Sequence, residues 1–134
     1  MSVARENVDV VRQVVELFES GGPEVIAPLL DSGIEIQPPP QAPEAGVYRG
    51  RSAALQRLAA ISEPFSEIHV RVDEITALDD QRVLAVVRVS ARGRSSDIPL
   101  ETQLVGLIRL RSGKLLQLRA FLDRDEALHQ ASSA

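Results

Sequence analysis

The last third of the chain contains two long runs in which apolar and polar residues alternate. The first run extends from Leu100 to Leu110, and the second resumes the apolar face at Leu116 and continues to Leu122. The dipeptide Ser112-Gly113 lies between the two runs and can form a tight turn. Alternation with a period of two is typical of half-buried strands, so we predict a β-hairpin with one apolar face.

This apolar face contains two small residues among large ones. Gly106 and Ala120 interrupt a row that otherwise consists mostly of leucine and isoleucine. A sheet that only backs a core usually carries larger side chains at such positions, because protein interiors are closely packed. The sequence therefore predicts a cavity next to this face, and it does not indicate which molecule occupies it.

Composition limits the classes of protein to be considered. The 134 residues predict a single domain, and the absence of cysteine excludes disulfides, thiol catalysis and cysteine-bound zinc. The net charge of −4 argues against a nucleic-acid partner, since such binding relies on a basic surface. No apolar stretch is long enough to span a membrane, and the first residues lack the apolar core of a secretion signal. We expect a cytoplasmic protein.

Helical patterns dominate the first half of the chain. The segment from Val8 to Phe18 has a wide apolar stripe, which predicts an amphipathic helix that ends at Gly21-Gly22. A short second helix is predicted from Pro23 to about Leu30, and a brief strand from Ile34 to Gln37. After a loop rich in proline, a third helix is predicted from Ser52 to Ser62.

Two further strands are predicted before the final hairpin. The first begins at Ile68 and continues to Leu78 with a bulge near Ile75, where the apolar phase shifts. The second runs from Val83 to Ala91, and its start is apolar on both faces, so we expect both faces to be covered there. Helices followed by an antiparallel meander indicate an α+β fold.

The order of these elements, the segment Ala42–Arg51 and the ending Gly113–Asp123 resemble the SnoaL-like branch of the nuclear transport factor 2-like superfamily. The resemblance covers nearly the whole chain. It implies a cone-shaped, curved antiparallel sheet wrapped around three N-terminal helices, with a pocket between the sheet and the first helix. It also implies a homodimer formed through the outer sheet face. Members of this superfamily include polyketide cyclases, ketosteroid isomerases and epoxide hydrolases.

The resemblance also indicates where the relatives carry catalytic groups. The general base, the tyrosine donor and the second acid of the isomerases correspond to Ile36, Val14 and Gly106, and the histidine and aspartate of the cyclases correspond to Gly106 and Ala120. None of these side chains can exchange a proton. The pocket walls that the resemblance implies are further lined by Phe18, Leu104, Ile108, Leu118 and Leu122. We therefore favour a domain that binds a small apolar molecule.

Two polar residues keep an enzymatic alternative open. Tyr48 could donate a hydrogen bond to a ligand, or it could pack its ring on the third helix with its hydroxyl in water. Asp123 could act as a displaced base, but the spacing of Asp123 and Glu126 favours a helix cap. Through such residues the protein could be an isomerase or cyclase that acts on a polyketide- or steroid-like substrate.

The histidines do not indicate a metal site. His69 and His129 have no partner at metal-binding spacing, so we predict no metal and no cofactor.

The opposite face of the final hairpin mixes apolar residues with arginine. This mixture is too apolar for a solvated face and too charged for a core, and it fits a partly polar subunit interface. We predict a homodimer through this face, formed by Val105, Leu107, Arg109, Arg119 and Phe121. A third alternative is an interaction module that binds a different protein through the same face.

Overall fold

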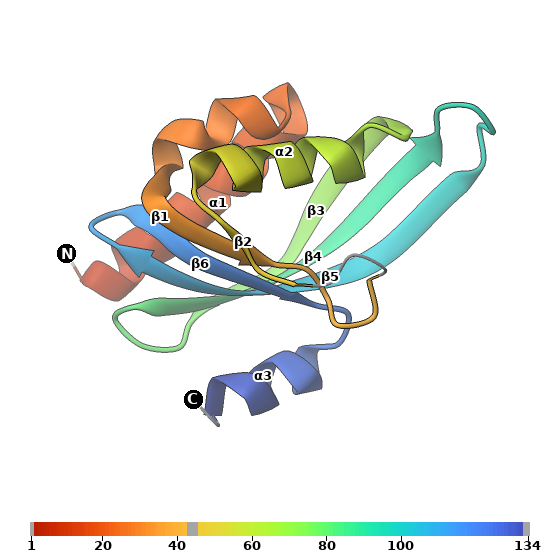
Figure 1. Ribbon diagram of the computed structural model, residues 1–134. Helices are drawn as coiled ribbons and strands as arrows, with labels where there is room; N and C mark the ends of the chain where they lie inside the picture. The colour runs from red at the N-terminus through yellow and green to blue at the C-terminus, as the bar shows by residue number, and fades with distance from the viewer. Residues whose placement is uncertain (1, 43–45, 133–134) are drawn as a thin grey trace.

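Six strands form one curved, open sheet in the computed structural model, which describes residues 2–42 and 46–132 (Figure 1). The strand order is β2-β1-β6-β5-β4-β3. The strands are β1 (Leu30–Gln37), β2 (Tyr48–Arg49), β3 (Phe65–Ala77), β4 (Arg82–Gly93), β5 (Pro99–Arg111) and β6 (Lys114–Phe121). All neighbours are antiparallel except β1 and β6, which run parallel. The predicted α+β fold is confirmed. One parallel pair is possible because no short turn joins β1 to β6.

The helices lie on both faces of this sheet (Figure 1). One face carries α1 (Val3–Gly21), the short helix η1 (Pro23–Leu29) and α2 (Arg51–Ser62), whereas α3 (Arg124–Ser132) packs on the other. The Ser2 side chain caps α1 by accepting a hydrogen bond from the Arg5 N–H at 3.1 Å. The second helix is a 3₁₀ helix that contains Pro28, a residue without an N–H to donate.

Two of the register shifts in the sheet bear on the predicted strand patterns. The predicted bulge in β3 is confirmed, since the pairing with β4 shifts between Val72 and Glu74. A second shift follows Arg109, and it brings Leu115 opposite Leu110. Leu115 is 2% exposed and takes the inner position that the sequence pattern assigned to Leu116. The prediction from strict alternation was therefore wrong by one residue at the start of β6.

The sheet separates two apolar cores. The inner core lies between the sheet and the N-terminal helices and includes Val11, Ile26, Leu30, Ile34, Ala54, Val83 and Leu110. The outer core lies beneath α3 and consists of Leu84, Val86, Val105, Leu107 and Phe121 with Ala127 and Ala131. Both faces at the start of β4 are thus covered, as its sequence predicted.

The outer core corrects one expectation about the predicted subunit interface. Val105, Leu107 and Phe121 were assigned to contacts with a second subunit, yet each is at most 5% exposed in the single chain. The chain's own α3 covers them, because the helix that starts at Arg124 turns back across the outer face. The homodimer itself stays a prediction, and its contacts cannot include these side chains while α3 is in place.

Polar contacts hold α3 against the sheet. The Arg124 guanidinium donates to both carboxylate oxygens of Glu74, at 2.8 and 3.0 Å. Arg82 donates to the carbonyl of Ala131, in the last turn of α3, at 2.8 Å. At the other end, Asp123 Oδ2 accepts from the Glu126 N–H at 3.0 Å, which confirms the predicted cap. Within the described ranges, no helix is long and apolar enough to cross a membrane.

Candidate functional site

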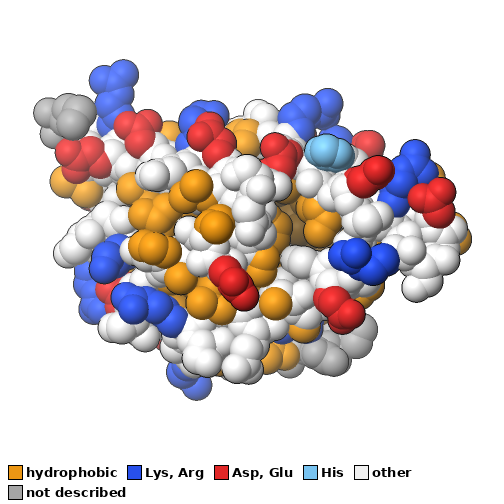
Figure 2. Space-filling view, turned by 90° about the horizontal axis from the view of Figure 1, so that it is seen from above, with side chains coloured by type: hydrophobic (Ala, Val, Ile, Leu, Met, Phe, Trp, Pro, Cys, Tyr) orange, Lys and Arg blue, Asp and Glu red, His pale blue; other side chains and the backbone are white. Residues whose placement is uncertain are grey.

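A cavity of about 350 Å³ lies between α1, α2, the loop after β1 and the inner face of the sheet. Its volume is near the lower end of the roughly 300–1,000 Å³ that is usual for small-molecule sites. Figure 2 shows hydrophobic side chains around a hollow on the face that carries α1, η1 and α2. The cavity contacts Pro38, Pro39 and Ala42 of the loop, so the loop forms part of its rim.

The first wall of the cavity comes from α1. Val11, Val14 and Val15 line it, and Phe18 continues the same stripe one turn further on. These positions are spaced i, i+3, i+4 and i+7, which brings their side chains onto one face of a helix. The wall is rigid in shape, since β-branched valine has few rotamers in a helix.

The floor of the cavity is a row of small residues on three adjacent strands. Gly106 of β5 pairs with Ala85 of β4 on one side and with Ala120 of β6 on the other. All three line the cavity, and they give it depth because they carry one side-chain carbon or none. The space at Gly106 is partly filled, since a Cβ added there would lie 3.3 Å from Leu118 Cδ1.

A smaller cavity of about 180 Å³ adjoins the first and extends toward η1. Val14, Ile36 and Leu104 line both cavities, and Phe18 with Ile26 lines only the smaller of the two. The two spaces therefore share an apolar wall.

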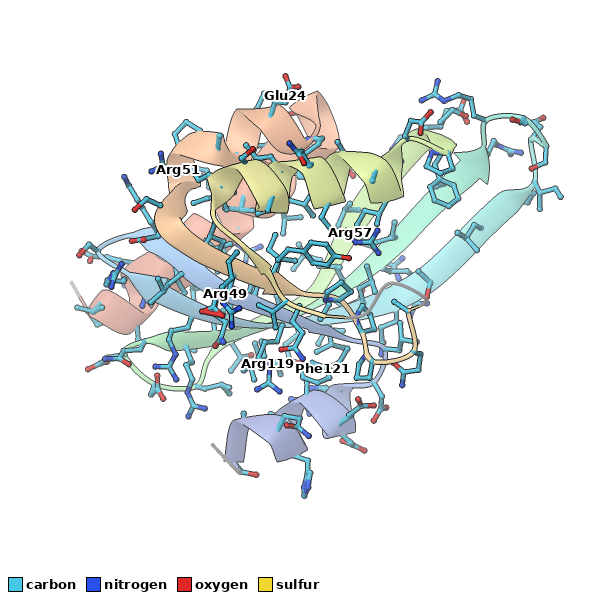
Figure 3. The ribbon with its side chains drawn as sticks, viewed as in Figure 1. Glu24, Arg49, Arg51, Arg57, Arg119 and Phe121 are labelled. Carbon is cyan, nitrogen blue, oxygen red and sulfur yellow. The ribbon has the colours of Figure 1, made fainter. Side chains whose placement is uncertain are left out.

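Arg57 of α2 is the one ionisable residue among the described residues that line either cavity. Figure 3 shows its side chain pointing from α2 toward the sheet. Its guanidinium lies over the Tyr48 ring, with 5.5 Å between Cζ and the ring centroid. This distance is within the range of a cation–π contact. The cavity is therefore apolar along its floor, and an arginine of α2 lies at one side.

The structure places most of the predicted ligand-binding residues in these walls. Seven of them line the larger cavity, namely Val14, Ile36, Leu104, Gly106, Ile108, Leu118 and Ala120, and Phe18 lines the smaller one.

The remaining predicted residues lie elsewhere. Tyr48 is half-buried at the edge strand β2, opposite Ile36 and against Arg57. Leu122 was predicted in the wall, but it follows the end of β6, is 42% exposed and lines neither cavity. Asp123 caps α3 and does not contact the cavity either.

Several lining residues were not predicted, although the spacing of apolar residues in the helices indicates some of them. On α2 the spacing 54, 57, 58, 61 gives an inward stripe of Ala54, Arg57, Leu58 and Ile61, and the prediction of this helix did not identify Arg57 as part of it. Other lining residues that were not predicted include Val11, Val15, Ala85, Val87 and Leu115. The helical ones could have been found by extending each stripe by one turn.

The residues with shifted pKa values lie outside the cavity and have local structural causes. The Gly33 N–H and the Arg111 guanidinium lower the pKa of Asp31, and the Gln81 N–H with Arg82 lowers that of Asp79. Neither carboxylate lines the cavity. These shifts therefore indicate turn and ion-pair contacts at the surface and identify no general acid or base.

A match to a family model shows which protein family the chain belongs to. The model of the SnoaL-like domain matches residues 11–118, which include the second half of α1, most of the sheet and every cavity-lining residue except Ala120. The chain belongs to the SnoaL-like domain family. The positions at which the resemblance located catalytic groups, Val14, Ile36, Gly106 and Ala120, all line the larger cavity of this family member. No curated protein matches the sequence at a significant level.

Solved structures show the same fold. An NTF2-like protein from Burkholderia xenovorans LB400 is 27% identical with a TM-score of 0.69, and the match covers 95% of each chain. The protein Bal32a from a soil-derived mobile gene cassette is 19% identical with a TM-score of 0.80, over 96% of this chain and 98% of that one. SalBIII, described as an epoxide hydrolase/cyclase-like enzyme in pyran ring formation in the polyether salinomycin, is 14% identical with a TM-score of 0.75, over 90% and 93%.

Proposed function

We propose that this SnoaL-like protein binds a small apolar molecule in the cavity between α1, α2 and the inner face of the sheet. The observation that carries the proposal is the row Ala85, Gly106 and Ala120, which leaves a hollow on an otherwise apolar face. Binding would be driven by removal of apolar surface from water, at about 25 cal/mol per Å². The valines of α1 give the ligand a preformed wall.

We further propose that binding here is not accompanied by the chemistry of the isomerases or cyclases. Val14, Ile36, Gly106 and Ala120 offer no group that could take or give a proton. Of the two polar candidates, Asp123 is occupied as a helix cap, which leaves Tyr48. An enzyme that acts on a polyketide- or steroid-like substrate would therefore have to depend on Tyr48 at the edge of the cavity.

A thermal-shift screen with steroids, terpenoids and aromatic polyketides tests the proposal. A ligand present at about 100 times its Kd stabilises the folded state by ~2.7 kcal/mol. This corresponds to a rise in Tm of roughly 10 °C for a chain of this size. The variant Ala120→Leu fills the floor of the cavity, so we expect it to fold and to lose the ligand-dependent rise.

Leu122→Ala is the matched control. It removes an exposed side chain near Ala120 that lies outside both cavities, so ligands should still raise its Tm as they do in the wild type. Binding at the cavity would be ruled out if Ala120→Leu kept the full rise. A screen in which no apolar compound stabilises the wild type would contradict the proposal altogether.

We also propose a homodimer that uses the polar part of the outer face. Gln103, Arg109 and Arg119 are half-buried, Arg109 donates to Gln81 Oε1 at 2.8 Å, and Arg119 donates to Gln130 Oε1 of α3 at 3.2 Å. Light scattering during size-exclusion chromatography should give twice the chain mass over a tenfold dilution. A monomer at every concentration would contradict the homodimer and favour an interaction with a different protein.

A further inference from the structure

The smaller cavity is too small to be a usual binding site of its own. Its volume of about 180 Å³ lies below the roughly 300–1,000 Å³ that is usual for small-molecule sites. Every described side chain that lines it is apolar, so a water molecule there would find no side-chain partner for a hydrogen bond. An empty apolar space also lacks the contacts that a packed core makes. A hydrocarbon group is therefore the kind of occupant that this space favours.

The smaller cavity lies behind the larger one as seen from the loop after β1. Pro38 and Pro39 of this loop line only the larger cavity, whereas Ile26 of η1 lines only the smaller one. Eight described side chains line both cavities and so form the boundary between them. A molecule that enters beside the loop would therefore reach the smaller cavity by passing these shared side chains.

Most of the shared side chains have little freedom to move. Ile36 and Leu115 are at most 5% exposed and belong to the inner core. Three others are valines, whose branch at Cβ restricts the χ1 angle. The remaining three are the leucines Leu58, Leu104 and Leu118, which are all half-buried. A movable boundary between the cavities must therefore be formed by a leucine.

Leu118 is the leucine whose tip lies over the floor of the larger cavity. A Cβ added at Gly106 would be 3.3 Å from Leu118 Cδ1, so the glycine leaves room for this tip. Along the sheet, Leu118 is paired with Ile108 of β5 on one side and with Ile36 of β1 on the other. Because Leu118 has space on both sides, a change of rotamer costs it few contacts.

We propose that the ligand is an elongated apolar molecule that ends in a flexible hydrocarbon chain, and that a rotamer change of Leu118 admits this chain to the smaller cavity. The proposal rests on the function proposed above and adds the chemical class of the ligand. The body of the ligand rests on the row Ala85, Gly106 and Ala120 in the larger cavity. Any polar group of the ligand stays at the rim, because burying it among apolar side chains without a hydrogen bond is costly.

A series of linear alcohols of increasing length tests the inference. Hexanol, octanol and decanol carry the same hydroxyl group and differ only in the length of the apolar chain. Each methylene group that leaves water strengthens binding about fourfold. Titration calorimetry on the wild type should therefore give decanol roughly 15-fold higher affinity than octanol.

Two variants fill the smaller cavity and leave the larger one as it is. Val70 of β3 and Val89 of β4 line only the smaller cavity. In Val70→Phe and in Val89→Phe the added ring occupies this space, so decanol should bind about tenfold more weakly and hexanol should change less than twofold. Val72→Phe is the matched control, since Val72 lies two residues further along β3 and lines neither cavity. It should bind both alcohols as the wild type does.

A third variant tests the movement of Leu118. Leu118→Ile keeps the volume of the side chain but moves its branch to Cβ, which restricts the χ1 angle. Decanol should then bind about fivefold more weakly, because the side chain must leave its preferred rotamer, and hexanol should change less than twofold. Leu116→Ile makes the same change on β6 outside both cavities and should have no effect on either alcohol.

The outcomes distinguish this inference from the proposed function. Equal affinities for octanol and decanol in the wild type, or binding of other apolar compounds but of no alcohol, would overturn the elongated ligand and leave apolar binding intact. Wild-type affinity for decanol in both filled variants would overturn the assignment to the smaller cavity. Unchanged decanol binding in Leu118→Ile would overturn the role of Leu118. If no alcohol binds, and the broader apolar screen also finds no ligand, the proposed function itself is wrong.

Discussion

The two faces of the sheet differ in how closely they are packed, although the same strands form both. On β5 and β6 the inward residues Gly106 and Ala120 are small and leave a hollow, whereas the outward residues Val105 and Phe121 are large and fully packed. Figure 3 shows Phe121 between the sheet and α3, and Arg57 on the other side of the sheet. At these positions the outer face is therefore closely packed, whereas the inner face leaves a cavity beside its own core. Four predictions test this contrast.

The largest effect is expected at the outer core. Phe121→Ala removes a ring that is 3% exposed, and we expect it to lower the free energy of unfolding by about 3–5 kcal/mol. Leu104→Ala on the inner face should lower it by only about 1–2 kcal/mol, since Leu104 is half-buried and already borders empty space. Urea denaturation measures both values. Equal losses would show that the inner face is packed as tightly as the outer one.

The same substitution on the two faces should have effects of opposite sign. Ala120→Leu adds apolar volume beside the cavity, so we expect it to raise the free energy of unfolding by about 0.5–2 kcal/mol. Ala127→Leu adds the same volume between α3 and the outer core, where Ala127 is 0% exposed, and should lower the free energy by about 1–3 kcal/mol. Thermal denaturation monitored by circular dichroism compares them. A loss in both variants would mean that no usable space exists next to Ala120.

A smaller effect is expected at the start of α3. Asp123→Ala removes the acceptor for the Glu126 N–H, which should cost about 1 kcal/mol. Since α3 covers only the outer face, ligand affinity at the cavity should stay unchanged. Hydrogen exchange should quicken in α3 and beneath it while the amides of α1 keep their protection. Weaker ligand binding in this variant would bring Asp123 back as a candidate for chemistry.

The smallest effect concerns the ion pair that fastens α3 to β3. Hydrogen bonds from Arg124 and Thr76 lower the pKa of Glu74 below its usual value of 4.5. A lowered carboxylate pKa stabilises the fold fully above pH 4.5, and this contribution is lost as the pH falls through the lowered value. Wild type should therefore lose more stability between pH 6 and pH 3 than Glu74→Gln does. Parallel curves for the two proteins would rule out this contribution.

Periodicity predicted most of the fold, because each strand has one face that is more apolar than the other. It failed where a local irregularity shifts the phase, as at Leu115, where the pairing slips after Arg109. The strand β2 was missed because two residues cannot establish a period. The small size of Gly106 and Ala120 indicated a cavity from the sequence pattern itself. The other five predicted wall residues of the larger cavity were identified through the family resemblance, since alternation alone cannot tell a cavity from a core.

The outer face was harder to predict than the inner one. The helix α3 was expected from its cap, but its sequence has few apolar residues. Alanines such as Ala127 and Ala131 occur at buried and exposed positions alike, so they did not indicate that α3 covers the outer core. An apolar outer face was therefore assigned to a second subunit. In the same way, Arg57 was overlooked because a charge on a short helix is usually solvated, and only its place in the inward stripe indicates otherwise.

The parallel pairing of β1 with β6 has a consequence for synthesis of the protein. Leu30 and Ile36 find their partners Leu115 and Leu118 near the opposite end of the chain. Until the ribosome has translated β6, β1 lacks this neighbouring strand, and the cavity wall opposite the valines of α1 is incomplete. Contacts this distant in sequence form slowly and leave apolar surface open to aggregation. The cavity can therefore close only after β6 has been translated.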